Sequence, residues 1–118
     1  MKKLRMAPLP EGWRRNIRAN RVEGSINIGG RLRFYDTRME FEPNLIERIV
    51  GTKSAEFRYC DIEKVSVIGS GVSAEGLFSG ALRRRICVDL KNSGAEVFVV
   101  NKVERVANQI EQARVRAL

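Results

Sequence analysis

The sequence predicts a mainly β (α+β) domain, an antiparallel β-sandwich or partly open barrel of six or seven strands capped by one C-terminal α-helix. Two observations support this prediction. Apolar residues recur at every second position through most of residues 22–100, and they take up helical spacing only beyond residue 102. A parallel sheet is excluded, because no crossover helices separate the predicted strands.

A β-hairpin is predicted over residues 31–42, where apolar and polar residues alternate on both sides of the turn at Asp36-Thr37. A shorter strand around Ile26 and Ile28 precedes the hairpin, and Gly29-Gly30 is expected to separate the two. The hairpin is expected to end before Asn44, because Pro43 lacks the N–H group that continues a ladder.

Residues 45–50 fit either a strand or a short helix, since a brief apolar run is compatible with both periods. A long glycine-rich loop is predicted over residues 69–84, and a tight turn at Asn92-Ser93-Gly94. The remaining strands are predicted at residues 55–59, 65–68, 86–90 and 96–100.

A single amphipathic helix is predicted over residues 102–115. Asn101 is its expected N-cap residue, and Glu104 is placed to complete a capping box. Its apolar face consists of Val103, Val106, Ala107, Ile110 and Ala113.

The 118 residues are enough for one domain, and they include no His and two Cys. Without His, neither a Ser-His-Asp nor a Cys-His arrangement can be assembled, and two Cys alone cannot form a tetrahedral zinc site. We therefore expect a protein that is not an enzyme, needs no cofactor or metal, and has no small-molecule substrate.

The first six residues begin like a signal peptide, but no apolar stretch follows them before Glu11. No apolar run approaches the roughly 18–20 residues that span a bilayer. A cytoplasmic protein is therefore expected, peripheral at the inner face of the membrane at most. Cys60 and Cys87 are then expected to be reduced and to pack as small apolar residues.

Residues 1–21 are expected to form a basic N-terminal arm in front of a domain at 22–118. This segment holds seven Lys or Arg and one Glu, out of a net charge of +8 for the chain. Such asymmetry favours an anionic partner, and Arg14, Arg15 and Arg18 are the candidate contacts. A solubilising tail is an equally good interpretation. Trp13 is expected to dock the arm onto the domain.

A second basic cluster follows apolar residues in the glycine-rich loop. Leu77, Phe78 and Leu82 run directly into Arg83, Arg84 and Arg85, a combination that suits an anionic membrane surface or a partner protein. The alternative is that the three apolar side chains pack the loop onto the barrel or form a dimer contact.

Residues 29–44 begin with Gly29-Gly30-Arg31-Leu32 and continue through Met39-Glu40-Phe41. Together with Asp61-Ile62-Glu63-Lys64-Val65 and the terminal helix, they resemble a GRAM domain, a branch of the pleckstrin-homology-like superfamily, over residues 22–115. The resemblance implies a non-catalytic seven-stranded sandwich or partly open barrel plugged by its C-terminal helix. It also implies binding of phosphoinositides, other anionic lipids or protein segments through loops.

The function predicted from the sequence is that of a binding module recruited to anionic phospholipid surfaces. Arg31 and Arg33 are expected to contact a headgroup if they lie at the same end of the barrel as Arg83–Arg85. The alternative is a protein-interaction or self-assembly domain, in which barrel edges dock a partner or a second copy. Nucleic acid is an unlikely partner, because the predicted domain has neither a base-reading helix nor a surface aromatic pair.

Overall fold

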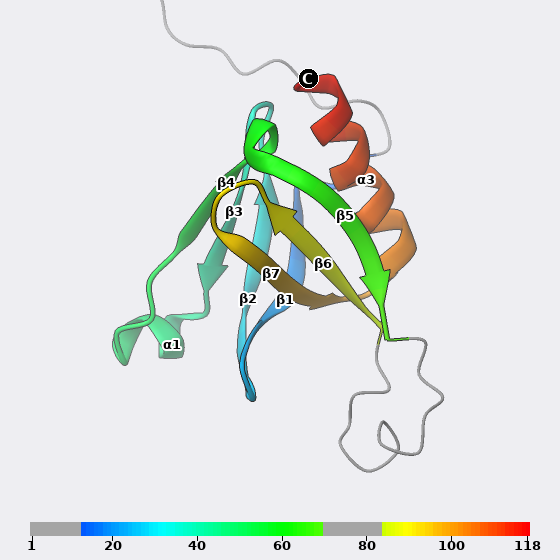
Figure 1. The fold of residues 1–118 in the computed structure, drawn as a ribbon. Helices are drawn as coiled ribbons and strands as arrows, with labels where there is room; N and C mark the ends of the chain where they lie inside the picture. The colour runs from blue at the N-terminus through cyan, green and yellow to red at the C-terminus, as the bar shows by residue number, and fades with distance from the viewer. Residues whose placement is uncertain (1–12, 70–83) are drawn as a thin grey trace, which may run out of the picture.

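The computed structural model describes residues 13–69 and 84–118. Within these residues, seven antiparallel strands form one sheet that curls into a half-barrel, and a C-terminal helix packs against it (Figure 1). The predicted fold class is therefore confirmed. The contact-loop residues Leu77, Phe78, Leu82 and Arg83, and the first twelve residues of the predicted arm, lie outside the described residues.

The strands are β1 (Asn16–Glu23), β2 (Ile26–Phe34), β3 (Arg38–Pro43), β4 (Ala55–Arg58), β5 (Ile62–Ile68), β6 (Arg85–Leu90) and β7 (Gly94–Val100). The helices are α1 (Leu45–Ile49), the 3₁₀ helix η1 (Tyr59–Asp61) and α3 (Val103–Arg116). The sheet order is β4-β3-β2-β1-β7-β6-β5. The edge strands β4 and β5 are therefore joined through η1, and the sheet stays open between them.

Strand β1 lies in the segment expected to be a basic arm. It pairs with β2 along its whole length and with β7 from Ala19 to Val22. Ile17 and Ala19 are buried, whereas Arg18 between them is exposed, which is the alternation of a half-buried strand. The expected boundary between residues 21 and 22 therefore falls inside a central strand, and residues 16–21 belong to the sheet.

Gly29 and Gly30 do not separate two strands, because β2 continues through both of them. A Cβ atom at Gly30 would lie 2.3 Å from the carbonyl oxygen of Glu42 and 3.0 Å from the Cα of Pro43, both backbone atoms. Gly30 is thus required by the close approach of β3, where a side chain has no room. The sequence alone does not distinguish such a site from a strand break.

The hairpin prediction and the C-terminal helix are confirmed, and residues 45–49 form a helix rather than a strand. The predicted capping box is wrong. The N-cap residue of α3 is Lys102, in a left-handed conformation with φ of 53°, and it makes no side-chain capping hydrogen bond. The Glu104 carboxylate is bonded instead to the guanidinium of Arg84.

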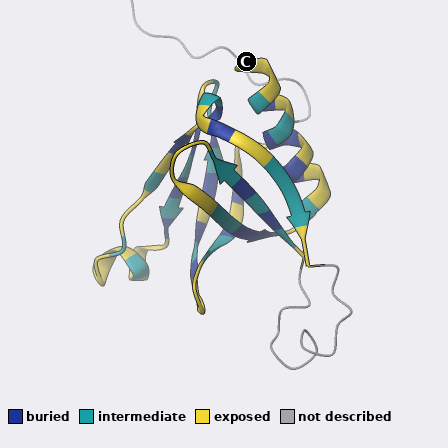
Figure 2. Cartoon of the chain, viewed as in Figure 1, coloured by how far each residue is buried: buried dark blue, intermediate teal, exposed yellow. Residues whose placement is uncertain are grey.

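The core lies between the concave face of the sheet and the inner face of α3 (Figure 2). Helix α3 packs chiefly on β5 and also contacts η1, β6 and β7. The fully buried side chains include Leu32, Met39, Phe41, Ile62, Ile86, Val88, Phe98 and Ile110. This packing leaves the outer face of the sheet and the strand connections for interactions with other molecules.

Candidate functional site

The two basic clusters expected to form one lipid site do not come together. Arg31 and Arg33 lie on β2, whereas Arg84 and Arg85 lie at the start of β6. Strands β1 and β7 separate β2 from β6, which places the clusters at least three strand spacings, about 14 Å, apart along the sheet. Each cluster must therefore be considered by itself.

Some of these arginines are already occupied by neighbouring side chains. Arg33 Nη2 lies 2.8 Å from Glu42 Oε1, and this hydrogen bond raises the pKa of the guanidinium. Arg84 is paired with Glu104, as noted above. Arg31 Nη1 donates a hydrogen bond of 3.1 Å to Asn16 Oδ1. A guanidinium that already holds a carboxylate is a poor receptor for a second anion.

The predicted arm residues differ in their placement. Arg14 and Arg18 line a pocket of about 350 Å³ between the start of β1 and the beginning of α3, called here the β1–α3 pocket. Arg15 is exposed outside that lining, and its backbone oxygen accepts a hydrogen bond from Phe34. Of the predicted anion-binding residues that the structure describes, Arg14 and Arg18 share one hollow.

The most exposed apolar cluster among the described residues lies on α1, which buries none of its side chains (Figure 2). Leu45, Ile46, Ile49 and Val50 are 64%, 75%, 74% and 72% exposed. These four residues are called here the α1 apolar surface. Isolated exposed apolar residues are ordinary, but four within six positions form a contiguous patch of the kind that marks an interaction site.

Charged residues flank the α1 apolar surface. Arg48 and Lys53 are exposed, and neither forms an ion pair with another described residue. Glu47 is half-buried, and its Oε1 accepts a hydrogen bond of 3.3 Å from the Thr52 hydroxyl. The acidic group is thus tied to the connection that follows the helix, while the two cations extend into solvent.

Further exposed apolar residues lie at the same end of the molecule. In Figure 1, α1 and the β1–β2 turn lie at the lower end of the half-barrel, as does the end of β5. Ile26 follows that turn and is 63% exposed, and Ile68 ends β5 and is 41% exposed. The sequence pattern favours Leu77, Phe78 and Leu82 as the apolar contact. It also contains the apolar run at 45–50, but whether that run is exposed depends on tertiary packing.

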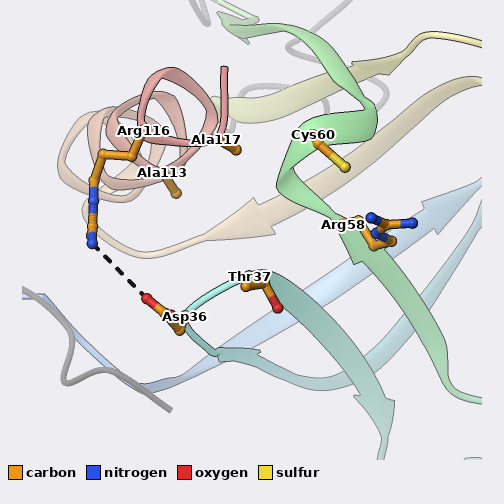
Figure 3. A pocket seen from close by; sticks show the side chains of 7 residues that line it. All are labelled: Asp36, Thr37, Arg58, Cys60, Ala113, Arg116 and Ala117. Carbon is orange, nitrogen blue, oxygen red and sulfur yellow. Dashed lines mark ion pairs between the residues drawn. The ribbon is translucent and has the colours of Figure 1, made fainter.

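A pocket of about 390 Å³ lies at the other end, between the β2–β3 turn, η1 and the last turn of α3 (Figure 3). In Figure 3, the side chain of Arg116 reaches from α3 toward Asp36, with 3.9 Å between Nη2 and Oδ1. Arg58 and Cys60 lie across the pocket. The pocket is lined by two cations, Arg58 and Arg116, and Asp36 balances the charge of Arg116. The pocket therefore has no strong preference for ligands of either charge.

Trp13 and the two cysteines lie in surroundings that indicate a role in packing rather than in ligand binding. Trp13 Nε1 donates to Gln112 Oε1 at 3.1 Å, and Arg116 lies over its ring, so this residue docks its segment on α3 as predicted. Cys60 and Cys87 are free and half-buried. Burial and the neighbouring Asp89 raise the pKa of the Cys87 thiol, which therefore stays protonated at neutral pH.

The described residues contain neither a membrane-spanning helix nor a metal-binding cluster. None of the helices they form is long and apolar enough to cross a bilayer. Over the same ranges, 13–69 and 84–118, no group of three His, Cys, Asp or Glu side chains is placed to hold a metal ion.

The chain resembles a solved structure in its fold. It is similar to the crystal structure of the C-terminal domain of an unknown protein from Leishmania infantum, with a TM-score of 0.62 and 13% sequence identity. The similarity covers 85% of this chain and 81% of that one. No family model and no curated protein matches the chain. At this identity, the likeness shows the fold alone.

Proposed function

We propose that this protein is a non-catalytic binding module of the pleckstrin-homology-like type that attaches peripherally to anionic membrane surfaces through the α1 apolar surface. The observation that carries the proposal is the exposure of Leu45, Ile46, Ile49 and Val50, each of which is uncovered over about two thirds of its surface or more. The seven antiparallel strands and the closing C-terminal helix are the architecture that the resemblance to GRAM domains implies.

Apolar burial supplies one part of the binding free energy. Fully burying a Val, Leu or Ile side chain contributes about 1.5–3 kcal/mol, and a shallow insertion into the headgroup region gains part of that for each residue. A folded protein gains nothing from holding four such side chains in water. An interfacial environment therefore accounts for their exposure better than solvent does.

Charge supplies the other part. Arg48 and Lys53 flank the apolar residues and extend into solvent. Each cation near an anionic bilayer contributes about 1 kcal/mol, an effect that salt screens. The net charge of +8 for the whole chain adds a longer-range attraction to the same kind of surface. An anionic bilayer thus matches both the apolar and the charged components.

Co-sedimentation with vesicles tests the proposal. At low salt, the wild-type protein is expected to bind vesicles of phosphatidylcholine and phosphatidylserine, and to bind pure phosphatidylcholine far less. The double variant Ile46→Ser, Ile49→Ser is expected to lose most of this binding. A matched control is Val115→Ser, which removes an exposed apolar side chain from α3 and should bind like wild type.

Two results would contradict the proposal: no vesicle binding by the wild type at low salt, or equal binding by the double variant and the control. A second copy of this chain is the alternative occupant that the α1 apolar surface also allows. In that case, light scattering of the purified chain would show a dimer that the double variant lacks, and vesicle binding would be absent.

A further inference from the structure

We propose that the β1–α3 pocket binds a compact oligophosphate group through Arg14, Arg18, Lys102 and Arg105. The pocket encloses about 350 Å³, a volume in the range of small-ligand sites. It is lined by the start of β1 and the first turns of α3, and Figure 1 shows α3 on the other side of the half-barrel from α1, so this site is separate from the proposed membrane contact. Sequence analysis proposed Arg14 and Arg18, whereas Lys102 and Arg105 join them only in the folded protein.

The charge of the pocket is uniform. Four of its lining residues are cations, and no Asp or Glu is among the described residues that line it. None of the four cations forms an ion pair within residues 13–69 and 84–118. The acidic residue of the first turn of α3, Glu104, is held by Arg84 instead. The site therefore has cationic groups that no internal carboxylate uses.

A fifth cation, Arg31, does not line the pocket but adjoins two residues that do, Arg18 and Asn16. Arg31 on β2 lies directly opposite Arg18 on β1, on the outer face of the sheet. On its other side, Arg31 lies opposite Glu42 of β3, so a carboxylate faces it there while a like charge faces it on β1. Arg31 Nη1 is held by Asn16 Oδ1, and Asn16 itself lines the pocket.

One wall of the pocket is fixed by a buried amide. Gln109 on α3 is 6% exposed, and its Oε1 accepts a hydrogen bond of 3.0 Å from the Arg14 backbone N–H. Its Nε2 donates to the Arg14 carbonyl oxygen at 2.9 Å. These two bonds fasten the segment before β1 to the helix and hold the cationic side chains of both around one hollow.

The number of cations indicates the class of ligand. A phosphate monoester carries close to two negative charges, which two cations balance. Four cations in the lining therefore match a group with at least two phosphates. Arginine also offers planar paired donors that suit phosphate oxygens. Such a group occurs in free oligophosphates and in the headgroups of polyphosphorylated lipids.

Calorimetric titration with inorganic pyrophosphate at low salt tests the site. The wild type is expected to show saturable binding to one site. Arg18→Gln and Arg105→Gln are each expected to weaken it by about tenfold or more, which is the typical cost of losing a charged hydrogen bond. The control Arg58→Gln removes the same charge at the end of β4, outside the β1–α3 pocket, and should stay within about twofold of wild type.

Two results would overturn the proposal: no saturable binding by the wild type, or an equal loss in all three variants, which would mean that net charge alone attracts the anion. Circular dichroism melting of each variant checks that the fold is retained. All three arginines are exposed, so each variant is expected to melt like wild type.

A second experiment distinguishes a free oligophosphate from a lipid headgroup as the source of the phosphate. Vesicles containing phosphatidylinositol bisphosphate are mixed with the α1 double variant, Ile46→Ser, Ile49→Ser. Recruitment that pyrophosphate competes away assigns the pocket to the lipid headgroup. Pyrophosphate binding without recruitment assigns it to a free oligophosphate. Because titration with pyrophosphate involves no membrane, the pocket is tested even if the membrane proposal fails.

Discussion

The two ends of the half-barrel use apolar residues in opposite ways. At the end closed by α3 and η1, Tyr59, Ile62 and Ile110 are almost fully buried, and the Tyr59 hydroxyl is hydrogen-bonded. At the end that carries α1, the four residues of the α1 apolar surface are mostly exposed. Similar residue types thus stabilise the fold at one end and remain free to bind at the other.

The two helices differ in exposure because other elements of the fold cover the apolar face of α3 but not that of α1. Helix α3 lies on β5, η1, β6 and β7, so its apolar face is covered along its length. Helix α1 has five residues and contacts only β3 appreciably. The Asn44 N–H, just before the helix, donates a hydrogen bond of 3.0 Å to the Gly29 carbonyl oxygen. Substitutions at the closed end are therefore expected to lower stability, whereas those on α1 are expected to affect binding.

The largest effect is expected at the closed end. Ile110→Ala removes a side chain with no exposed surface and leaves a cavity, which lowers the free energy of unfolding by about 2–5 kcal/mol. Urea denaturation measures this change. Val115→Ala on the exposed side of the same helix is the control, with an expected change within about 0.5 kcal/mol. Equal losses for the two variants would mean that α3 is not seated as described.

The next effect is expected where the sheet gives way to α1. Gly30→Ala places a methyl group against the backbone of Glu42 and Pro43, and overpacking of this kind costs about 1–3 kcal/mol. Gly29→Ala meets mainly the movable amide of Asn44, at 2.8 Å, and is expected to cost less. Thermal melting of both variants ranks them. A reversed order would contradict the close approach of β3 to Gly30.

A smaller effect is expected from the Tyr59 hydroxyl, which donates to the Tyr35 carbonyl oxygen at 2.9 Å. Burial raises the pKa of Tyr59, so above about pH 10 the folded state keeps a proton that the unfolded chain loses. Stability therefore falls as pH rises through that range. Tyr59→Phe is expected to cost about 0.5–1.5 kcal/mol at neutral pH and to flatten the alkaline decline in denaturation curves.

The smallest effect on stability is expected at the α1 end. The double variant Ile46→Ser, Ile49→Ser should change the free energy of unfolding by no more than about 0.5 kcal/mol per site, because neither side chain is buried. Its effect should appear in vesicle binding alone. If urea denaturation showed a loss comparable to that of Ile110→Ala, the two ends would not differ as described.

Short-range patterns predicted much of this fold. Alternation over residues 31–42 identified the hairpin, and the helical spacing from Val103 to Ala113 identified α3. Strand β1 escaped prediction because its basic residues dominate the composition of residues 1–21, although Ile17 and Ala19 alternate as a strand requires. Its place at the centre of the sheet depends on pairing with β7, about eighty positions away along the chain.

The sequence by itself determined the class of the fold, the hairpin over residues 31–42, the C-terminal helix and the excess of positive charge, because these depend on residue type and local spacing. Only the tertiary structure decided which cations share a hollow and which apolar residues stay uncovered. Arg18 and Arg105 line the same pocket because of strand pairing and helix docking. The exposure of Ile46 likewise depends on what packs beside it. Both depend on contacts between distant segments, which local spacing does not encode.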